Sequence, residues 1–277
     1  MAIKNFISTV WSENLYHALD KQYVAVANCN RDYEGEIREK GSIVKICGLE
    51  PINIADYNKN ANMSLPATLS DNVRELVIDQ AKCFNFQIDD IDRAQSTPKL
   101  MELAMKNAAN ALADTADAFV YSLYENAGST VDKSGVTVDN IVDILIDART
   151  QLFMNNVSDP SDIVIEVSPE IAGLILKAKV ALSSDNGEAL ENGCIGSIGG
   201  CKIFVSNNII REETEDGMIH RCFARTKRAI AFAEQLSEID AYRPELRFAD
   251  AVKGLHLYGA KVIYPDEMVT LNLSMAE

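Results

Sequence analysis

The sequence predicts an α+β fold in which some elements reach beyond a compact core. Residues 79–92, DQAKCFNFQIDDID, alternate apolar with polar side chains, as a strand does. One long helix is predicted soon after them, from Pro98 to Asn126, and at ~1.5 Å per residue it would run about 40 Å. Residues 136–234 then alternate helical and strand patterns, which is typical of a compact α/β unit. The strand and the long helix are therefore predicted to reach across neighbouring molecules.

Composition sets limits on the class of protein. The chain has 277 residues, of which 47% are hydrophobic and 24% charged, so a sizeable core is expected. No run approaches the ~18–20 consecutive apolar residues of a membrane span, and MAIKNFISTVW at the start lacks a signal-peptide layout. We therefore expect cytoplasmic synthesis and no membrane partner. The net charge of −15 disfavours a protein that grips nucleic acid, because phosphate contacts need clustered Lys and Arg.

Cysteine and histidine spacing predicts neither a metal nor a cofactor. The six cysteines include no CxxC pair, and His17, His220 and His256 match no zinc spacing. Reduced and mostly buried thiols are expected instead. Residues 185–200, DNGEALENGCIGSIGG, are glycine-rich but contain neither dinucleotide nor nucleotide phosphate motif, so we predict a flexible loop there.

The N-terminal residues 1–29 are predicted to form an arm. Ser12–Tyr23 is amphipathic, with Leu15 and Leu19 on one face, and Trp11 lies directly ahead of it. An amphipathic segment of this kind is expected to dock onto another surface.

Residues 30–92 are predicted to form an extended β loop. Strand-like segments between Ile43 and Ile54 lead outward, and Val73–Ile88 returns. Residues 57–72, YNKNANMSLPATLSDN, have no period and are rich in Asn and Ser, as a solvated loop tip is. A long two-stranded arm is only marginally stable alone, so we expect it to lie on a neighbour.

The long helix has start and stop signals. Thr97 is placed to cap it, Pro98 suits the first helical position, and Asn126 with Gly128 marks its end. One apolar stripe is predicted along it, formed by Leu100, Ala104, Ala108, Leu112, Ala116, Phe119 and Leu123. The helix is interpreted as a spine, although a plain long core helix has the same periodicity.

The α/β unit at 136–234 is predicted in more detail from its caps and apolar runs. Helices are expected over 138–155 and after Ser168, which would cap a helix beginning at Pro169. Strands are expected over 163–167, 201–205, 218–223 and 229–233.

Charged clusters are interpreted as solvated surface. Arg221, Arg225, Lys227 and Arg228 follow the acidic run 211–216, which would neutralise them. The aspartates at 89–92 lack the calcium-loop glycine and glutamate, and the carboxylates at 212–216 lack apolar surroundings that would raise a pKa. Nucleophile and zinc-hydrolase motifs are missing from the sequence, which argues against an enzyme.

Residues 239–273 return to β character. Arg243, Glu245, Arg247 and Asp250 alternate in sign around a proline, which suits an edge that meets another subunit; a self-contained charged loop is the alternative. Because residues 235–277 look unlike the α/β unit, we expect them to pair with the long helix in residues 93–135 and with the base of the extended β loop, as a discontinuous domain.

Four runs resemble one protein family. They are NRDYEGEI at 30–37, VIDQAKCFNFQIDDID at 77–92, ALADTADAF at 111–119, and FAEQLSEIDAYRPELRFADAVKGLHLYGAKVIYPD at 232–266. These runs resemble the major capsid proteins of tailed double-stranded-DNA bacteriophages with the Hong Kong 97 fold. The resemblance implies an N-terminal arm at 1–29, an extended loop at 30–92, a peripheral domain at 93–135 and 235–277 with its spine helix, and an axial domain at 136–234.

The resemblance also implies how the protein works. Copies would form hexamers and pentamers that close into an icosahedral shell, and the acidic chain would enclose double-stranded DNA without adhering to it. A separate scaffolding protein is expected because the arm starts almost at Met1; a portal protein and a decoration protein are further expected partners. Assembly in the bacterial cytoplasm and residence in the virion follow. Lys59 does not by itself predict the covalent crosslink of some relatives.

The residues expected at assembly contacts are Trp11, Tyr57, Lys59, Met63, Leu65, Arg243, Glu245, Arg247 and Asp250. An encapsulin, which encloses cargo enzymes with the same fold, is the first alternative. An α/β enzyme with a regulatory arm is the second, and the sequence offers it no activatable side chain.

Overall fold

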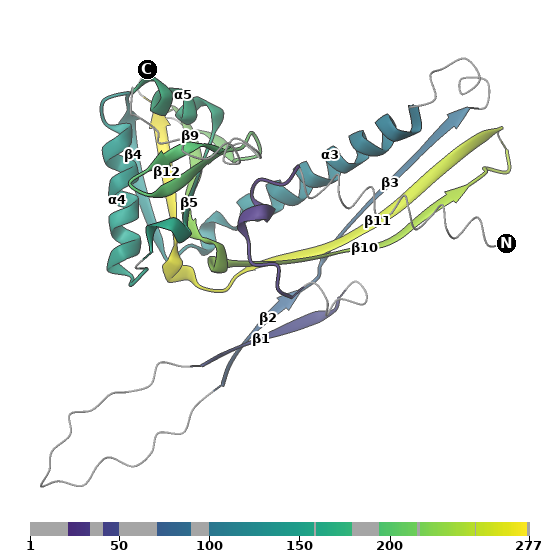
Figure 1. The fold of residues 1–277 in the computed structure, drawn as a ribbon, viewed down its shortest axis with the longest axis horizontal. Helices are drawn as coiled ribbons and strands as arrows, with labels where there is room; N and C mark the ends of the chain where they lie inside the picture. The colour runs from purple at the N-terminus through teal and green to yellow at the C-terminus, as the bar shows by residue number, and fades with distance from the viewer. Residues whose placement is uncertain are drawn as a thin grey trace, which may run out of the picture.

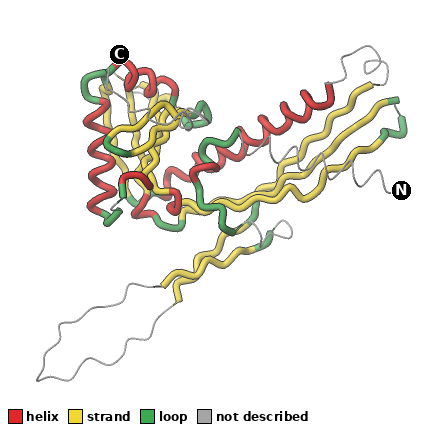
Figure 2. Tube along the Cα trace, viewed as in Figure 1, coloured by secondary structure: helices red, strands yellow, loops and turns green. Residues whose placement is uncertain are grey.

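The computed structural model describes residues 22–33, 41–49, 71–89, 100–157, 159–178, 194–214, 217–246 and 248–275. They form a compact unit on a seven-stranded sheet and an elongated part on a three-stranded sheet (Figure 1). A two-stranded hairpin projects from the inner end of the elongated part, and helices accompany both sheets (Figure 2).

The compact unit is built on a mixed sheet with the strand order β4-β12-β9-β5-β7-β6, and β8 pairs with β9. β4 pairs with β12 and β5 with β7 in parallel, whereas β9 runs antiparallel to β12 and β5. The strands are β4 (Ser129–Val136), β5 (Ile163–Val167), β6 (Cys194–Ile198), β7 (Cys201–Val205), β8 (Arg211–Thr214), β9 (Gly217–Thr226) and β12 (Met268–Met275).

Helices α4 (Ile141–Met154) and α5 (Pro169–Lys177) pack on this sheet. Leu145 of α4 and Ile171 of α5 are fully or almost fully buried in one cluster with Ala224 of β9. Side chains alternate along β9, so Phe223 turns to the opposite face and joins the core of the elongated part. Short 3-10 turns complete the unit at η4 (Pro160–Asp162), η6 (Lys227–Ala229) and η7 (Pro265–Glu267).

The elongated part is an antiparallel sheet in the order β10-β11-β3, built from β10 (Ile230–Tyr242), β11 (Ala249–Val262) and β3 (Gln80–Asp89). Helix α3 (Leu100–Tyr121) runs alongside it and continues as the 3-10 turn η3 (Ser122–Asn126) (Figure 1). The rings of Phe119 and Tyr258 meet edge to face, with centroids 5.6 Å apart. Residues buried on α3 are Ala109, Leu112, Ala113, Ala116, Asp117, Val120 and Tyr121.

The projecting hairpin consists of β1 (Ile43–Leu49) and β2 (Asp71–Val77), which pair antiparallel. Alternate residues, Val44, Ile46 and Leu76, are buried in a small cluster with Ala233 and Leu257 of the three-stranded sheet. On the opposite face, Ile43 and Val77 lie across from each other and are about half exposed. Among the described residues, the inner face of the hairpin is therefore anchored to its own chain, whereas Ile43 and Val77 leave part of the other face exposed.

Several sequence predictions match the structure closely. β5 has the predicted bounds, β7 does too, and α5 begins at Pro169 with Ser168 as its cap. The Ile171 amide donates to Ser168 Oγ at 3.4 Å. The long helix is present, but its α-helical part ends at Tyr121; Thr97 and Pro98 lie outside the described residues.

Two local predictions are wrong. Residues 73–88 form no single returning strand: β2 pairs with β1, the chain breaks at Ile78, and β3 joins a different sheet. Within the predicted flexible loop at 185–200, residues 194–198 form β6 and a tight turn follows, because Gly199 and Gly200 adopt positive φ. Residues 185–193 lie outside the described residues.

The predicted division at residue 235 also differs from the sheets observed. β12 joins the seven-stranded sheet between β4 and β9 instead of the sheet beside α3. β10 starts at Ile230, inside the predicted α/β unit, yet it belongs to the three-stranded sheet. β4 occupies residues 129–136, which no prediction assigned to a strand, and delays α4 to Ile141.

Candidate functional site

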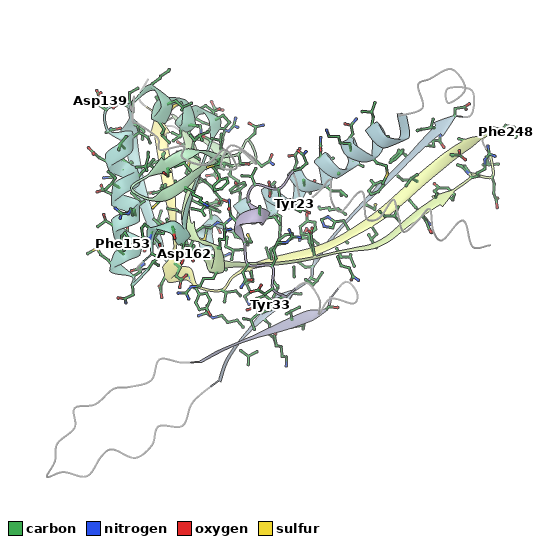
Figure 3. The ribbon with its side chains drawn as sticks, viewed as in Figure 1. Tyr23, Tyr33, Asp139, Phe153, Asp162 and Phe248 are labelled. Carbon is green, nitrogen blue, oxygen red and sulfur yellow. The ribbon has the colours of Figure 1, made fainter. Side chains whose placement is uncertain are left out.

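A short N-terminal segment, Tyr23–Arg31, lies where the two parts meet, and we call it the anchor segment (Figure 3). It contains the 3-10 turn η1 (Val26–Asn28). The backbone amides of Val24 and Val26 donate to the two carboxylate oxygens of Asp117 on α3, at 2.9 and 3.0 Å. Asp117 is only 2% exposed. Burial raises the pKa of Asp117 to about 7, although the two amide bonds oppose that rise.

A buried ion pair ties the anchor segment to the compact unit. Arg225 of β9 donates through Nε and Nη2 to both oxygens of Glu166 on β5, at 3.1 and 3.0 Å. The same guanidinium donates to the carbonyls of Asn28 and Ala25, at 2.6 and 3.0 Å. Burial raises the pKa of Glu166, and the Arg225 charge beside it counters the effect. Both side chains are inaccessible to solvent, so the pair depends on these fixed hydrogen bonds.

Glu234 of β10 ties the anchor segment to the elongated part. It accepts hydrogen bonds from Tyr23 Oη and from Arg31 Nη2, the latter at 2.8 Å. Nε2 of the buried His256 on β11 lies 2.8 Å from the same carboxylate. Asn30 also pairs with Ala231 as an isolated parallel bridge, with Asn30 N–H donating to Ile230 and Phe232 N–H to Asn30. The anchor segment thus contacts both sheets and α3.

The far end of the elongated part exposes apolar side chains. Leu246 is 97% exposed and Phe248 is 85% exposed, the two highest values among the large apolar residues described. Both lie in the turn between β10 and β11, and Figure 3 places Phe248 at the end of the sheet farthest from the compact unit. We call residues 242–250 the sheet tip. Two such exposed side chains in one turn favour a binding surface.

The sequence predicted charged contacts at the sheet tip. Arg243 Nε and Asp250 Oδ1 lie 3.5 Å apart within the chain, and Glu245 is exposed. Arg247 lies outside the described residues, as do the other predicted contacts, Trp11, Tyr57, Lys59, Met63 and Leu65. The role of all nine in assembly stays a prediction.

The prediction for the basic cluster is confirmed only for Arg221, whose Nη2 lies 2.5 Å from Glu212 of the acidic run. Arg228 pairs with Glu267 instead, and Arg225 is not solvated but fully buried with Glu166. Sequence reasoning missed the whole anchor site. Asp117 follows Ala116 directly and lies beside the predicted apolar stripe of the long helix. A carboxylate at that place in the sequence could have indicated a buried polar contact, because a buried charge needs hydrogen-bond partners.

Groups suited to enzymatic or metal chemistry are sparse in the described ranges. No cluster of three or more His, Cys, Asp or Glu that could hold a metal occurs among those residues. A pocket of about 350 Å³ at the junction is lined by Asp159, Asp162, Lys227 and Arg228, with Asn156, Val157 and Thr226. Of the five cysteines whose side chains the structure describes, Cys83 alone is exposed, and burial raises the pKa of Cys29 to about 11. None of the described helices is long and apolar enough to cross a membrane.

The fold of this chain is similar to the folds of several solved structures. The chain is similar to a structure from Mycobacterium phage Che8, with 29% identity over 90% of this chain and 91% of that one, and a TM-score of 0.70. The capsid of Ralstonia phage GP4 superposes with a TM-score of 0.70 at 12% identity, covering 94% and 91% of the two chains. A virus-like particle from Pyrococcus furiosus gives a TM-score of 0.57 at 12% identity, covering 96% and 99%.

A sequence-family model shows which protein family the chain belongs to. No curated protein sequence matches the chain. The model of the phage capsid protein family matches residues 75–271, well over half of the chain, and this range runs from β2 through β12. It includes both sheets, α3 and the sheet tip, so the match extends over the compact unit and the elongated part alike. The chain therefore belongs to the phage capsid protein family.

Proposed function

We propose that this chain is the major capsid protein of a tailed phage, and that its copies form hexamers and pentamers closing into an icosahedral head around double-stranded DNA. Heterologous contacts between identical copies produce rings when the rotation closes. In the Hong Kong 97 arrangement that we propose, the seven-stranded unit takes the axial position. The three-stranded sheet with α3 takes the peripheral position.

The observation that carries this proposal is the exposure of Leu246 and Phe248 at the end of a long sheet. In a single chain, almost all of the apolar surface of these two side chains faces water. Burial of that surface against a neighbouring copy would be favourable by about 25 cal/mol per Å². The sheet tip lies at the end of the three-stranded sheet away from the compact unit (Figure 1), where a neighbouring copy would contact it. Membership of the phage capsid protein family supports the same proposed function.

The other assembly contacts follow from the projecting elements. The exposed face of the hairpin, with Ile43 and Val77, would lie on an adjacent copy, and so would the loop residues Tyr57, Lys59, Met63 and Leu65. Trp11 would dock the N-terminal arm. At the sheet tip, Arg243, Glu245, Arg247 and Asp250 would set the register with charges of alternating sign.

Further partners are proposed on the same basis. A separate scaffolding protein would guide curvature, a portal protein would occupy one vertex, and a decoration protein could cover the outer surface. The net charge of −15 suits a wall that repels packaged DNA instead of binding it. Assembly would take place in the host cytoplasm before the shell becomes part of the virion.

Electron microscopy of the full chain, expressed alone and with the products of neighbouring genes, tests the proposal. Closed shells or hexamer-based polyheads are expected, with closure dependent on a second protein. Deleting residues 63–68 in the loop is expected to leave a folded chain that no longer closes shells. A discrete small oligomer in both expressions would contradict the proposed function.

An encapsulin-type compartment is the second candidate, because the virus-like particle from Pyrococcus furiosus covers nearly the whole chain. Its identity of 12% supports the shared fold alone. An encapsulin would close without scaffold and enclose a protein. Particles purified from cells expressing this chain alone would separate the two: regular closed shells with a protein cargo favour the compartment.

A further inference from the structure

One arginine of the compact unit has no acidic partner in its own chain. Arg149 lies on α4, and the residues three and four positions away on the helix are all apolar, namely Leu145, Ile146, Leu152 and Phe153. The Nε of Arg149 is buried without a hydrogen-bond partner, and its guanidinium forms no ion pair within the described part of the chain. Because carboxylates are the preferred partners of arginine, this favours a carboxylate from outside the chain.

Two contacts hold the Arg149 guanidinium in place. Its Cζ lies 4.7 Å from the centroid of the Phe153 ring, one turn further along α4. It also lies against the tight turn between β6 and β7, where a Cβ at Gly199 would come within 3.3 Å of Arg149 Nη1. The side chain is nevertheless only partly buried. A planar donor group is therefore presented near the surface, and binding would cost it little further conformational entropy.

The exposed side of the same helix carries unpaired carboxylates. Asp143 and Asp147 lie one turn apart on α4, both are exposed, and neither is paired with a cation within the part of the chain described. A step of two residues turns a helix by about 200°, so Asp147 and Arg149 lie on different sides of α4. This helix forms the side of the compact unit away from the elongated part, where another copy can reach both groups (Figure 1).

We propose that Arg149 of one copy binds the carboxylates of Asp143 and Asp147 on α4 of the next copy, and that this contact joins neighbouring compact units within a ring. The inference rests on the proposed function, because it needs copies that meet side by side. The two groups occupy different sides of α4, as a heterologous contact requires. Every copy would take part twice, once through its arginine and once through its carboxylates, so losing the contact affects the whole ring.

Charge reversal followed by mixing of two full-length variants tests this contact. Arg149→Glu sets a negative charge against Asp143 and Asp147 of the next copy, and the double variant Asp143→Lys with Asp147→Lys sets positive charges against Arg149. Because like charges repel, each variant alone should lower the assembled fraction about tenfold at a concentration where the wild type is half assembled. An equimolar mixture should restore assembly, since alternating copies again bring opposite charges together. Sedimentation velocity measures the assembled fraction.

A control and the possible outcomes separate this contact from the proposed function. Lys177→Glu makes a matching charge change at an exposed position of α5 and should assemble like the wild type. If Arg149→Glu does not fold, by circular dichroism, the double aspartate variant decides through its own loss of assembly. Variants that assemble as well as the wild type, or a mixture no better than its components, would overturn the contact and leave the proposed function standing. A wild-type chain that stays monomeric, even with the products of neighbouring genes, would overturn both.

Discussion

The compact unit and the elongated part differ in how much of their surface their own chain covers. In the compact unit, α4, α5 and the seven-stranded sheet bury one continuous cluster that includes Leu145, Ile165 and Leu271. In the elongated part, α3 accompanies a sheet that ends in Leu246 and Phe248, both almost fully exposed. The described part of the hairpin continues this trend, because its inner face is covered whereas Ile43 and Val77 on the other face are about half exposed. A chain that completes one core and leaves another surface open is suited to assembly.

The anchor segment explains how such different parts hold one relative position. Three chain crossings connect the two sheets: η3 to β4, β9 to β10, and β11 to β12. Backbone hydrogen bonds hold the crossings together, as from Gly128 to Pro265 at 2.9 Å and from Ile263 to Ala229 at 2.7 Å. The buried Arg225–Glu166 ion pair adds a hydrogen-bond network between the compact unit and the anchor segment, and this network depends on every partner being present.

The largest effect on stability is expected from a substitution in this ion pair. Arg225→Ala leaves Glu166 buried without its cation and removes four hydrogen bonds, two to Glu166 and one each to the carbonyls of Asn28 and Ala25. It should therefore destabilise the chain by about 3–5 kcal/mol. Arg228→Ala, which breaks the more exposed pair with Glu267, should cost under about 1 kcal/mol. Urea unfolding followed by circular dichroism measures both. Equal losses in the two variants would mean that burial does not distinguish these ion pairs.

One substitution made in both regions sharpens the comparison. Leu145→Ala opens a cavity in the compact core and should destabilise by about 2–5 kcal/mol. Leu246→Ala removes a side chain that touches almost nothing in the isolated chain and should change stability by less than about 0.5 kcal/mol. Thermal unfolding gives the stabilities, and sedimentation gives the yield of particles.

Substitutions at the sheet tip should affect assembly more than stability. Leu246→Ala combined with Phe248→Ala is expected to reduce particle formation while the unassembled chain remains folded. Undiminished particles from this double variant would show that the sheet tip is not an assembly surface.

A smaller effect is expected where the hairpin crosses the three-stranded sheet. A Cβ at Gly259 would lie 2.3 Å from the Val77 carbonyl oxygen and 3.1 Å from Ile78 Cα, so Gly259→Ala must push the hairpin base away. A loss of about 1–3 kcal/mol is expected, with faster hydrogen exchange in residues 71–78. Unchanged exchange there would contradict the predicted displacement.

The smallest effect has the opposite sign. Gly173 lies in α5 and has open space around its Cβ position, so Gly173→Ala should stabilise the compact unit by about 0.5–1 kcal/mol. Differential scanning calorimetry would detect the rise in melting temperature. A destabilised variant would mean that helix propensity does not govern this position.

Local signals in the sequence predicted the elements that local chemistry determines. Ser168 and Pro169 fixed the start of α5 because a cap and a first-turn proline act within three residues. β12 could not be placed in this way, since its partners β4 and β9 lie far away in the sequence. Nor could the break at Ile78, because the residues on both sides of it alternate as strands do.

The candidate site was less predictable than the fold. Residues 243–250 were recognised by their alternating charges, but the exposure of Leu246 and Phe248 is a property of the long hairpin that carries them. The burial of Asp117 depends on the anchor segment, more than eighty residues earlier in the chain. Helical periodicity alone describes one element and contains no information about what covers it.

Cryo-electron microscopy of the particles formed by the full chain tests the central claim most directly. The side chains of Leu246 and Phe248 are predicted to be buried against a neighbouring copy, while the core around Leu145 keeps contacts only within its own chain. Particles in which the sheet tip still faces solvent would contradict the account.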